Sequence, residues 1–261
     1  MRARKRFGQH FLEPAWVAKL VAAIDPQPDQ TFLEIGAGRG ALTGPLAARA
    51  ARVVAIEIDR DLVAGLHDRQ MPRVEIVETD ILDLDLETLA LPAGTRVAGN
   101  LPYNISSPIL ARLVEMQRTS GRLRDATLML QREVADRIAA GPGTREYGPL
   151  AILLGLAARV ERLMTLPPGA FRPPPKVTSA VVRLSFHSAE TLRALPHLLD
   201  SLVRTAFTKR RKTLANALAG ALPSGHGTAL LARAGIDGRR RPEALSPAEW
   251  VTLARLAETR E

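Results

Sequence analysis

A four-residue segment, Asn100-Leu101-Pro102-Tyr103, carries the residue types most able to act on an adenine base. The adenine amino group is a poor nucleophile because its lone pair is delocalised into the ring. Two acceptors for its hydrogens, the Asn100 side-chain oxygen and the Leu101 carbonyl that Pro102 holds in place, would make the nitrogen reactive. The Tyr103 ring offers a flat face on which an extruded base can stack. The alternative is a turn that ends a strand and contains a buried tyrosine.

A glycine-rich loop, Gly36–Gly40, has glycine at every second position and stands between an apolar segment and a helical pattern. Gly36 and Gly38 would let the backbone approach a ligand closely. Glu57 follows about 20 residues later, the distance at which an acid binds a ribose diol. The glycine spacing typical of dinucleotide-binding loops is absent. The Glu34 carboxylate would repel a pyrophosphate but suits a cationic group of a ligand. These residues predict a nucleoside cofactor, the alternative being glycines that serve packing alone.

A second acid, Asp80, follows the next predicted strand and precedes Ile81. The Asp80 carboxylate could accept a hydrogen bond from the amino group of a cofactor adenine, with Ile81 as an apolar wall beside the ring. An isolated acid in such a place is more often a helix cap or a turn residue. Both interpretations remain open from the residues alone.

The elements that must position these residues alternate along the chain. Apolar patterns predict strands at residues 31–35, 53–58, 73–77, 95–99, 126–130 and 179–186, and helices at 14–24, 60–69, 107–117, 131–140 and 150–158. This alternation is typical of an α/β fold with a parallel sheet, in which ligands bind at the carboxyl ends of the strands. Each candidate residue above follows such a strand.

The pattern changes near residue 187, where we place a domain boundary. Residues 188–261 show only helical patterns and are rich in positive charge. The stretch 201–241 contains a single acid, Asp237, and nine basic residues: Arg204, Lys209, Arg210, Arg211, Lys212, Arg233, Arg239, Arg240 and Arg241. Phe207, Leu214 and Leu218 predict one helix around which the basic residues 209–212 project. The charge indicates a polyanion partner such as nucleic acid; the alternative is a solvated charged face.

Composition excludes several classes of protein. The chain has 261 residues and no cysteine, which excludes a disulfide scaffold, a cysteine-ligated zinc site and a thiol nucleophile. The longest apolar run is about half a membrane span, so we expect a soluble cytoplasmic protein without membrane contact. None of the five histidines has the spacing of metal ligands, and we expect no metal. We expect a monomer.

With these residues in place, the chain closely resembles the ribosomal RNA adenine dimethyltransferase family, and within it the enzymes of the small ribosomal subunit. The resemblance covers almost the whole chain. The matching segments are residues 5–12, 33–38, 56–59, 99–106, 130–133, 171–177, 179–184 and 210–213. The segments Asn100–Ser106 and Phe171–Val177 are highly specific together.

The resemblance implies S-adenosylmethionine as cofactor and a Rossmann-like methyltransferase domain over residues 1–187, followed by an all-helical RNA-binding domain over 188–261. It implies dimethylation of the 6-amino groups of two adjacent adenosines near the 3′ end of 16S ribosomal RNA in the small subunit, with a role in ribosome biogenesis. The family usually has Asn where this chain has His10. The implied cofactor contacts are His10, Leu12, Gly36, Gly38, Glu57, Asp80 and Asn100.

On this basis we expect the amino nitrogen to attack the methyl group directly, with catalysis by positioning. Phe171 would cover the base face that Tyr103 leaves free, and Arg210, Arg211 and Lys212 would bind RNA phosphates.

Three alternatives remain. These are a macrolide-resistance type of methyltransferase acting on large-subunit RNA, a non-catalytic ribosome-assembly factor on the same fold, and a nicotinamide dehydrogenase, which the glycine spacing disfavours.

Overall fold

The computed structural model describes residues 10–219 and 226–259, so part of the matching segment 5–12 lies outside the described residues. Two compact units divide the chain. The first, here the sheet unit, comprises Met1–Ala135 and Arg159–Ala189; the second, here the helical unit, comprises Asp136–Ala158 and Glu190–Glu261. Among the described residues, no helix is long and apolar enough to cross a membrane.

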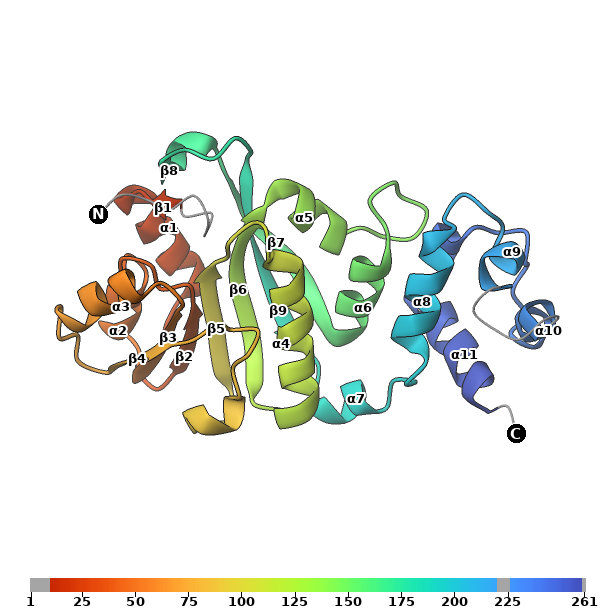
Figure 1. Ribbon diagram of the computed structural model, residues 1–261, viewed down its shortest axis with the longest axis horizontal. Helices are drawn as coiled ribbons and strands as arrows, with labels where there is room; N and C mark the ends of the chain where they lie inside the picture. The colour runs from red at the N-terminus through yellow and green to blue at the C-terminus, as the bar shows by residue number, and fades with distance from the viewer. Residues whose placement is uncertain (1–9, 220–225, 260–261) are drawn as a thin grey trace. The chain divides into compact units, whose positions relative to one another are not determined.

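The sheet unit is built on seven strands in the order β4-β3-β2-β5-β6-β9-β7 (Figure 1). Strands β4 to β6 in that order are parallel, and β9 runs antiparallel to β6. The predicted α/β class is therefore confirmed, although the sheet is mixed because β9 is antiparallel. The strand bounds are Thr31–Ile35 (β2), Arg52–Glu57 (β3), Val74–Glu78 (β4), Thr95–Asn100 (β5), Leu123–Gln131 (β6), Ala158–Leu166 (β7) and Ser179–Phe186 (β9).

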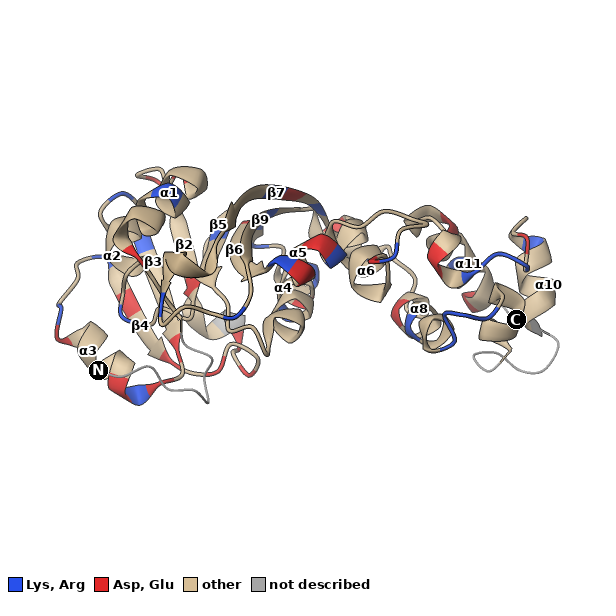
Figure 2. Ribbon diagram, turned by 90° about the horizontal axis from the view of Figure 1, so that it is seen from above, with Lys and Arg blue, Asp and Glu red and all other residues tan. Residues whose placement is uncertain are grey.

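Helices cover both faces of this sheet, which explains why its central strands are almost continuously apolar. Figure 2 shows α1 and α4 on opposite sides of it. Helix α1 begins with Pro14 at its first position, where the missing N–H costs nothing. The Asp59 side chain caps α3 through the Asp61 amide at 3.2 Å. The helix bounds are Pro14–Ile24 (α1), Thr43–Ala47 (α2), Arg60–His67 (α3), Ser106–Ser120 (α4) and Arg132–Ile138 (α5), and a short 3₁₀ turn spans Leu86–Leu89.

A separate two-stranded ribbon joins distant parts of the sheet unit. Strand β1, Phe11–Leu12, pairs antiparallel with β8, Phe171–Arg172, which follows a 3₁₀ turn at Pro168–Ala170. The pairing aligns Leu12 with Phe171. It ties the segment before α1, which lines the cavity described below, to the proline-rich turn.

The helical unit has its own apolar core around Trp250, which is 0% exposed. Residues Ala151 and Ile152 of α6 are buried in this core, so α6 belongs to the helical unit and not to the residues 1–187 with which the sequence grouped it. The helix bounds are Pro149–Ala157 (α6), Ala189–Arg193 (α7), Leu199–Thr208 (α8), Leu214–Leu218 (α9), His226–Arg233 (α10) and Pro247–Glu258 (α11), with a 3₁₀ turn at Pro242–Ala244.

The single helix expected to span Phe207 to Leu218 is wrong. Helix α8 ends at Thr208, and a new helix, α9, begins only at Leu214. The chain turns between them because the backbone N–H of Leu214 bonds the Arg240 carbonyl at 2.7 Å, which docks α9 against the segment before α11. Residues 209–212 form this turn, which we name the basic turn; Figure 2 shows the blue segment that follows α8.

Candidate active site

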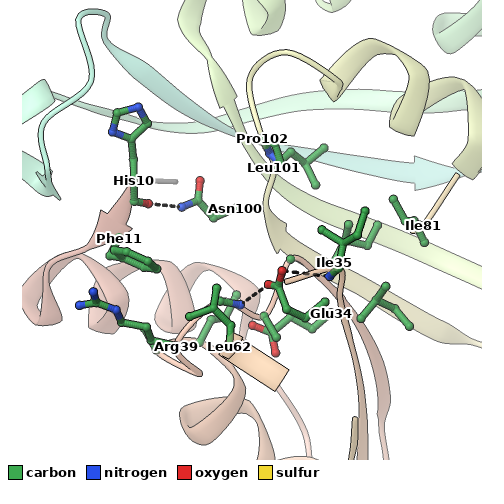
Figure 3. Close-up of a pocket in the computed structure, with 18 of the residues that line it drawn as sticks. His10, Phe11, Glu34, Ile35, Arg39, Leu62, Ile81, Asn100, Leu101 and Pro102 are labelled. Carbon is green, nitrogen blue, oxygen red and sulfur yellow. Dashed lines mark hydrogen bonds between the residues drawn. The ribbon is translucent and has the colours of Figure 1, made fainter. Parts of the chain in front are cut away.

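A cavity of about 280 Å³ lies within the sheet unit at the carboxyl ends of β2, β3 and β5 (Figure 3). This is where ligands bind in parallel α/β sheets. The structure brings most of the predicted site residues together there. Those lining the cavity are His10, Leu12, Gly36, Gly38, Glu57, Asp80, Asn100, Leu101, Pro102 and Tyr103.

The glycine loop bends sharply at the cavity wall. Gly36 and Gly38 have φ angles of +73° and +59°, a region that side chains with a Cβ rarely adopt. A Cβ on Gly99, in the neighbouring strand β5, would lie 2.6 Å from the Ile35 carbonyl oxygen. The loop therefore needs glycine for its turns, and β5 needs Gly99 for its close approach to β2.

Glu57 is fixed by backbone donors. Its Oε2 accepts the Gly38 N–H at 2.8 Å, and its Oε1 accepts those of Ile58 and Asp59 at 3.0 and 2.9 Å. The side chain is 8% exposed and lines the cavity. A carboxylate held in this way keeps a fixed orientation, and its Oε2, which accepts one backbone N–H, retains a lone pair for a ligand such as a ribose diol.

Glu34 lies beside the loop with an unused acceptor. It is 1% exposed, and its Oε2 has no hydrogen-bond partner among the described residues. Burial, with a smaller contribution from the charge of Glu57, raises the pKa of Glu34 to about 7. A buried acid of this kind matches the cationic group that the sequence suggested for the ligand. Figure 3 shows Glu34 among the residues around the cavity.

Asp80 combines the two roles that the sequence left open. Its Oδ1 accepts the Leu82 N–H at 2.9 Å, so the residue does stabilise a turn. It also lines the cavity, next to Ile81, which is 5% exposed. The second carboxylate oxygen can therefore accept from a ligand while the first holds the turn.

The Asn100 amide is oriented by the backbone of His10. The Asn100 Nδ2 donates to the His10 carbonyl oxygen at 2.9 Å, as Figure 3 shows. With Nδ2 committed to a carbonyl, which can only accept, the Oδ1 is the atom left to accept a hydrogen from a ligand. Leu101 follows directly, with its N–H bonded to the Met129 carbonyl at 3.2 Å.

Tyr103 is held by two contacts that the sequence did not predict. The Tyr103 hydroxyl lies 2.6 Å from Ser179 Oγ, and the His10 ring stacks on the Tyr103 ring at a centroid distance of 5.7 Å. Burial raises the pKa of Tyr103, although the hydrogen bond to Ser179 lowers it. Ser179 begins β9 and pairs with Gln131 at the carboxyl end of β6. Nothing local in the sequence marks that pairing.

The expected role of Phe171 on the open face of a base is wrong. Its side chain is 0% exposed and packs in the core with Leu166 and Met129. The pairing of β8 with β1 turns the residue inward. A ring with no exposed surface cannot stack on a ligand.

The three basic residues expected to bind RNA lie in the helical unit and differ in their surroundings. Arg210 is half-buried, lies 3.7 Å from Glu243 Oε2 and donates to the Thr144 carbonyl. Arg211 and Lys212 are exposed, and no hydrogen bond or ion pair involves their side chains within residues 10–219 and 226–259. Arg210 therefore anchors the basic turn, whereas its two neighbours present charge to solvent.

No group of acids and histidines in the described parts of the chain could hold a metal ion.

The sequence model of the family described as Ribosomal RNA adenine dimethylase matches residues 1–259. A protein of Aromatoleum aromaticum named Ribosomal RNA small subunit methyltransferase A is 48% identical over 97% of this chain and 93% of its own length. A protein of the same name from Pseudomonas fluorescens is 45% identical over 97% of this chain and 93% of its own length.

Solved structures resemble this fold over almost its whole length. A dimethyladenosine transferase from Plasmodium falciparum has a TM-score of 0.79 at 25% identity and covers 94% of this chain and 96% of its own. The 23S rRNA methyltransferase ErmE has a TM-score of 0.64 at 26% identity, with 95% and 100% covered.

Proposed function

The chain belongs to the ribosomal RNA adenine dimethylase family, and from this premise we propose that it dimethylates the 6-amino groups of two adjacent adenosines near the 3′ end of 16S ribosomal RNA, with S-adenosylmethionine as methyl donor. The substrate is the RNA in the small ribosomal subunit, which places the reaction in the cytoplasm and in ribosome biogenesis. The observation that carries the proposal is the orientation of Asn100, whose Nδ2 bonds the His10 carbonyl and leaves Oδ1 as an acceptor.

The cavity suits the cofactor at each of its parts. Glu57 binds the ribose diol, Asp80 accepts from the adenine amino group, and the buried, unpartnered Oε2 of Glu34 faces the ammonium of the methionine end. Gly36 and Gly38 let the backbone lie close to the ligand. When bound, S-adenosylmethionine supplies a methyl group made electrophilic by its sulfonium.

The chain contributes positioning to the reaction. Asn100 Oδ1 and the Leu101 carbonyl accept the two hydrogens of the target amino group, which turns the nitrogen lone pair out of conjugation and toward the methyl donor. Tyr103 stacks on the target base and fixes its plane. Because the two reactants are already held in this orientation, the reaction does not lose the translational and rotational entropy that a collision in solution would cost.

The basic turn supports binding to RNA phosphates. We assign the contacts to Arg211 and Lys212, with Arg210 holding the turn in place through Glu243. The large-subunit alternative receives less support, because the relatives of the small-subunit type are 48% and 45% identical and ErmE is 26% identical. A non-catalytic factor would have no need for the oriented Asn100 acceptor.

Mapping of dimethyladenosine in ribosomal RNA tests the proposal. Cells that lack the gene should lose the modification at the 3′ end of 16S RNA and regain it with the wild-type gene. The Asn100→Ala variant should lose about a hundredfold in turnover, the effect of removing one oriented hydrogen bond in an active site, while cofactor affinity changes less. Unmodified 16S RNA in complemented cells, or turnover close to wild type in the variant, would contradict the proposal.

A further inference from the structure

The imidazole of His10 lies on a face of the Tyr103 ring. The ring centroids are 5.7 Å apart and the planes are inclined by 25°, the arrangement of an offset stack. Both residues line the cavity. The side chain of His10 therefore occupies part of the surface on which a flat ligand would stack.

Both rings are tethered at this separation. The His10 Nδ1 lies 2.8 Å from the Pro173 carbonyl oxygen, and the Tyr103 hydroxyl lies 2.6 Å from Ser179 Oγ. A base inserted between them would add one aromatic thickness, about 3.4 Å, which is the spacing of stacked bases. That separation would break at least one of the two hydrogen bonds. A base cannot enter between the rings as they stand.

The position of His10 also coincides with the approach to Asn100. The His10 carbonyl bonds Asn100 Nδ2 at 2.9 Å, so the same residue touches both the acceptor amide and the stacking ring. A base that brings its amino group to Asn100 Oδ1 and lies on Tyr103 from the cavity side therefore meets the imidazole. Among the described residues, the ring of His10 has one hydrogen bond, through Nδ1, and that bond must break for the ring to leave Tyr103.

We propose that the His10 imidazole is a placeholder for the target base: it covers Tyr103 in the RNA-free enzyme, and the entering base displaces it. The inference rests on the proposed function, because it assumes that an adenosine enters this cavity. Displacement sets a cost that every entering base must overcome.

Two variants separate the ring of His10 from its hydrogen bond. His10→Asn keeps an N–H donor for Pro173 but removes the ring, whereas His10→Phe keeps a ring on Tyr103 and removes the donor. The matched control is His197→Asn, at an exposed histidine of the helical unit. The readouts are the KM and kcat for unmethylated 30S particles and the Kd for S-adenosylmethionine.

For His10→Asn we expect the KM for the particle to fall about two- to tenfold, the range of one aromatic pair, and any change in kcat or in the cofactor Kd to be the same as in His10→Phe. His10→Phe should leave the KM at the wild-type value or raise it, and the control should match wild type in all three quantities. A KM that rises in His10→Asn would show that the imidazole supports the bound base, and an unchanged KM would show that it does not compete with it. Either result overturns the proposal. Failure of the proposed function is distinct, because the wild type itself would then transfer no methyl group.

Discussion

The side-chain hydroxyls of Tyr103 and Ser179 lie 2.6 Å apart, although 76 residues separate them in the chain. Ser179 is 0% exposed and stands at the start of β9, next to the carboxyl end of β6. The bond fixes the Tyr103 ring at the mouth of the turn that follows β5. The sequence indicated a role for the Tyr103 ring as a stacking surface but none for its hydroxyl.

Removing this bond should slow methylation moderately. Tyr103→Phe and Ser179→Ala each lose the same hydrogen bond, and we expect each to reduce kcat/KM by up to about tenfold. Because both variants remove one shared interaction, the double variant should be no worse than either single one. Tyr103→Ala, which also loses the stacking surface, should lose more, up to about a hundredfold. Additive losses in the double variant would argue against the shared bond.

The sequence predicted the strands that surround the site better than the partners of the site residues. Strands β2 and β9 occupy the predicted residues, because uninterrupted or alternating apolar patterns mark them clearly. Strand β7 was missed because it lies at the edge of the sheet and carries Arg159, Glu161 and Arg162, which obscure the pattern.

The residues that the sequence misplaced depend on pairings across long separations. Phe171 begins the proline-rich segment 171–177 and was expected to cover a base, but its pairing with Leu12 turns it into the core. Helix α6 is apolar on all sides, so its pattern indicated that it is buried but not which elements it packs against. Its partners are α8 and α11. By contrast, the cavity residues were predictable because they end strands that are adjacent in the sheet.

Replacing Glu34 should raise the stability of the protein above neutral pH but weaken its binding of the cofactor. Its pKa of about 7 lies above the ordinary 4.5, so the native state holds a proton that the unfolded state releases. Ionisation of Glu34 therefore lowers stability as the pH rises from about 5 through 7, by on the order of 3 kcal/mol. Glu34→Gln should flatten this dependence and be more stable than wild type at pH 8, as measured by urea unfolding.

The same substitution should weaken the cofactor. An ammonium needs the ionised Glu34, so wild-type affinity for S-adenosylmethionine should fall as the pH drops below about 7, with a proton released on binding. Calorimetry in buffers of different ionisation enthalpy measures that proton. In Glu34→Gln both the affinity and the proton release should be lost. Wild-type affinity in the variant would remove Glu34 from the ligand site.

A buried ion pair should control the stability of the sheet unit. Arg96 is 5% exposed, and its guanidinium binds both oxygens of Asp125 at 3.0 Å as well as the Ile24 and Asp25 carbonyls at the end of α1. Arg96→Met would leave the buried Asp125 carboxylate with only the more distant Arg124, at 3.9 Å, and would remove a donor from the Ile24 carbonyl, at a cost of roughly 3–5 kcal/mol. Denaturant unfolding measures this. The double variant Arg96→Met/Asp125→Leu should recover part of the loss; if it is less stable still, the unpaired charge is not the cause.

The basic turn should determine how RNA affinity depends on salt. Arg211 and Lys212 are exposed and, within the described residues, unpaired, so each can neutralise a phosphate and release a counterion. Arg204 and Arg239 are exposed as well, but Asp200 and Asp237 pair with them. Replacing either pair by Gln removes the same charge, which makes the second pair a matched control.

Filter binding of a 30S particle at several salt concentrations separates the two variants. Arg211→Gln/Lys212→Gln should weaken binding and flatten the slope of log affinity against log salt by up to about two contacts. Arg204→Gln/Arg239→Gln should change the slope much less, because its cations already have partners. Neither variant should alter the cofactor Kd, since the cavity lies within the sheet unit. If both variants flatten the slope equally, the total positive charge of the helical unit, and not the basic turn, accounts for the affinity. If Arg211→Gln/Lys212→Gln leaves the slope unchanged, the phosphate contacts lie elsewhere on the chain.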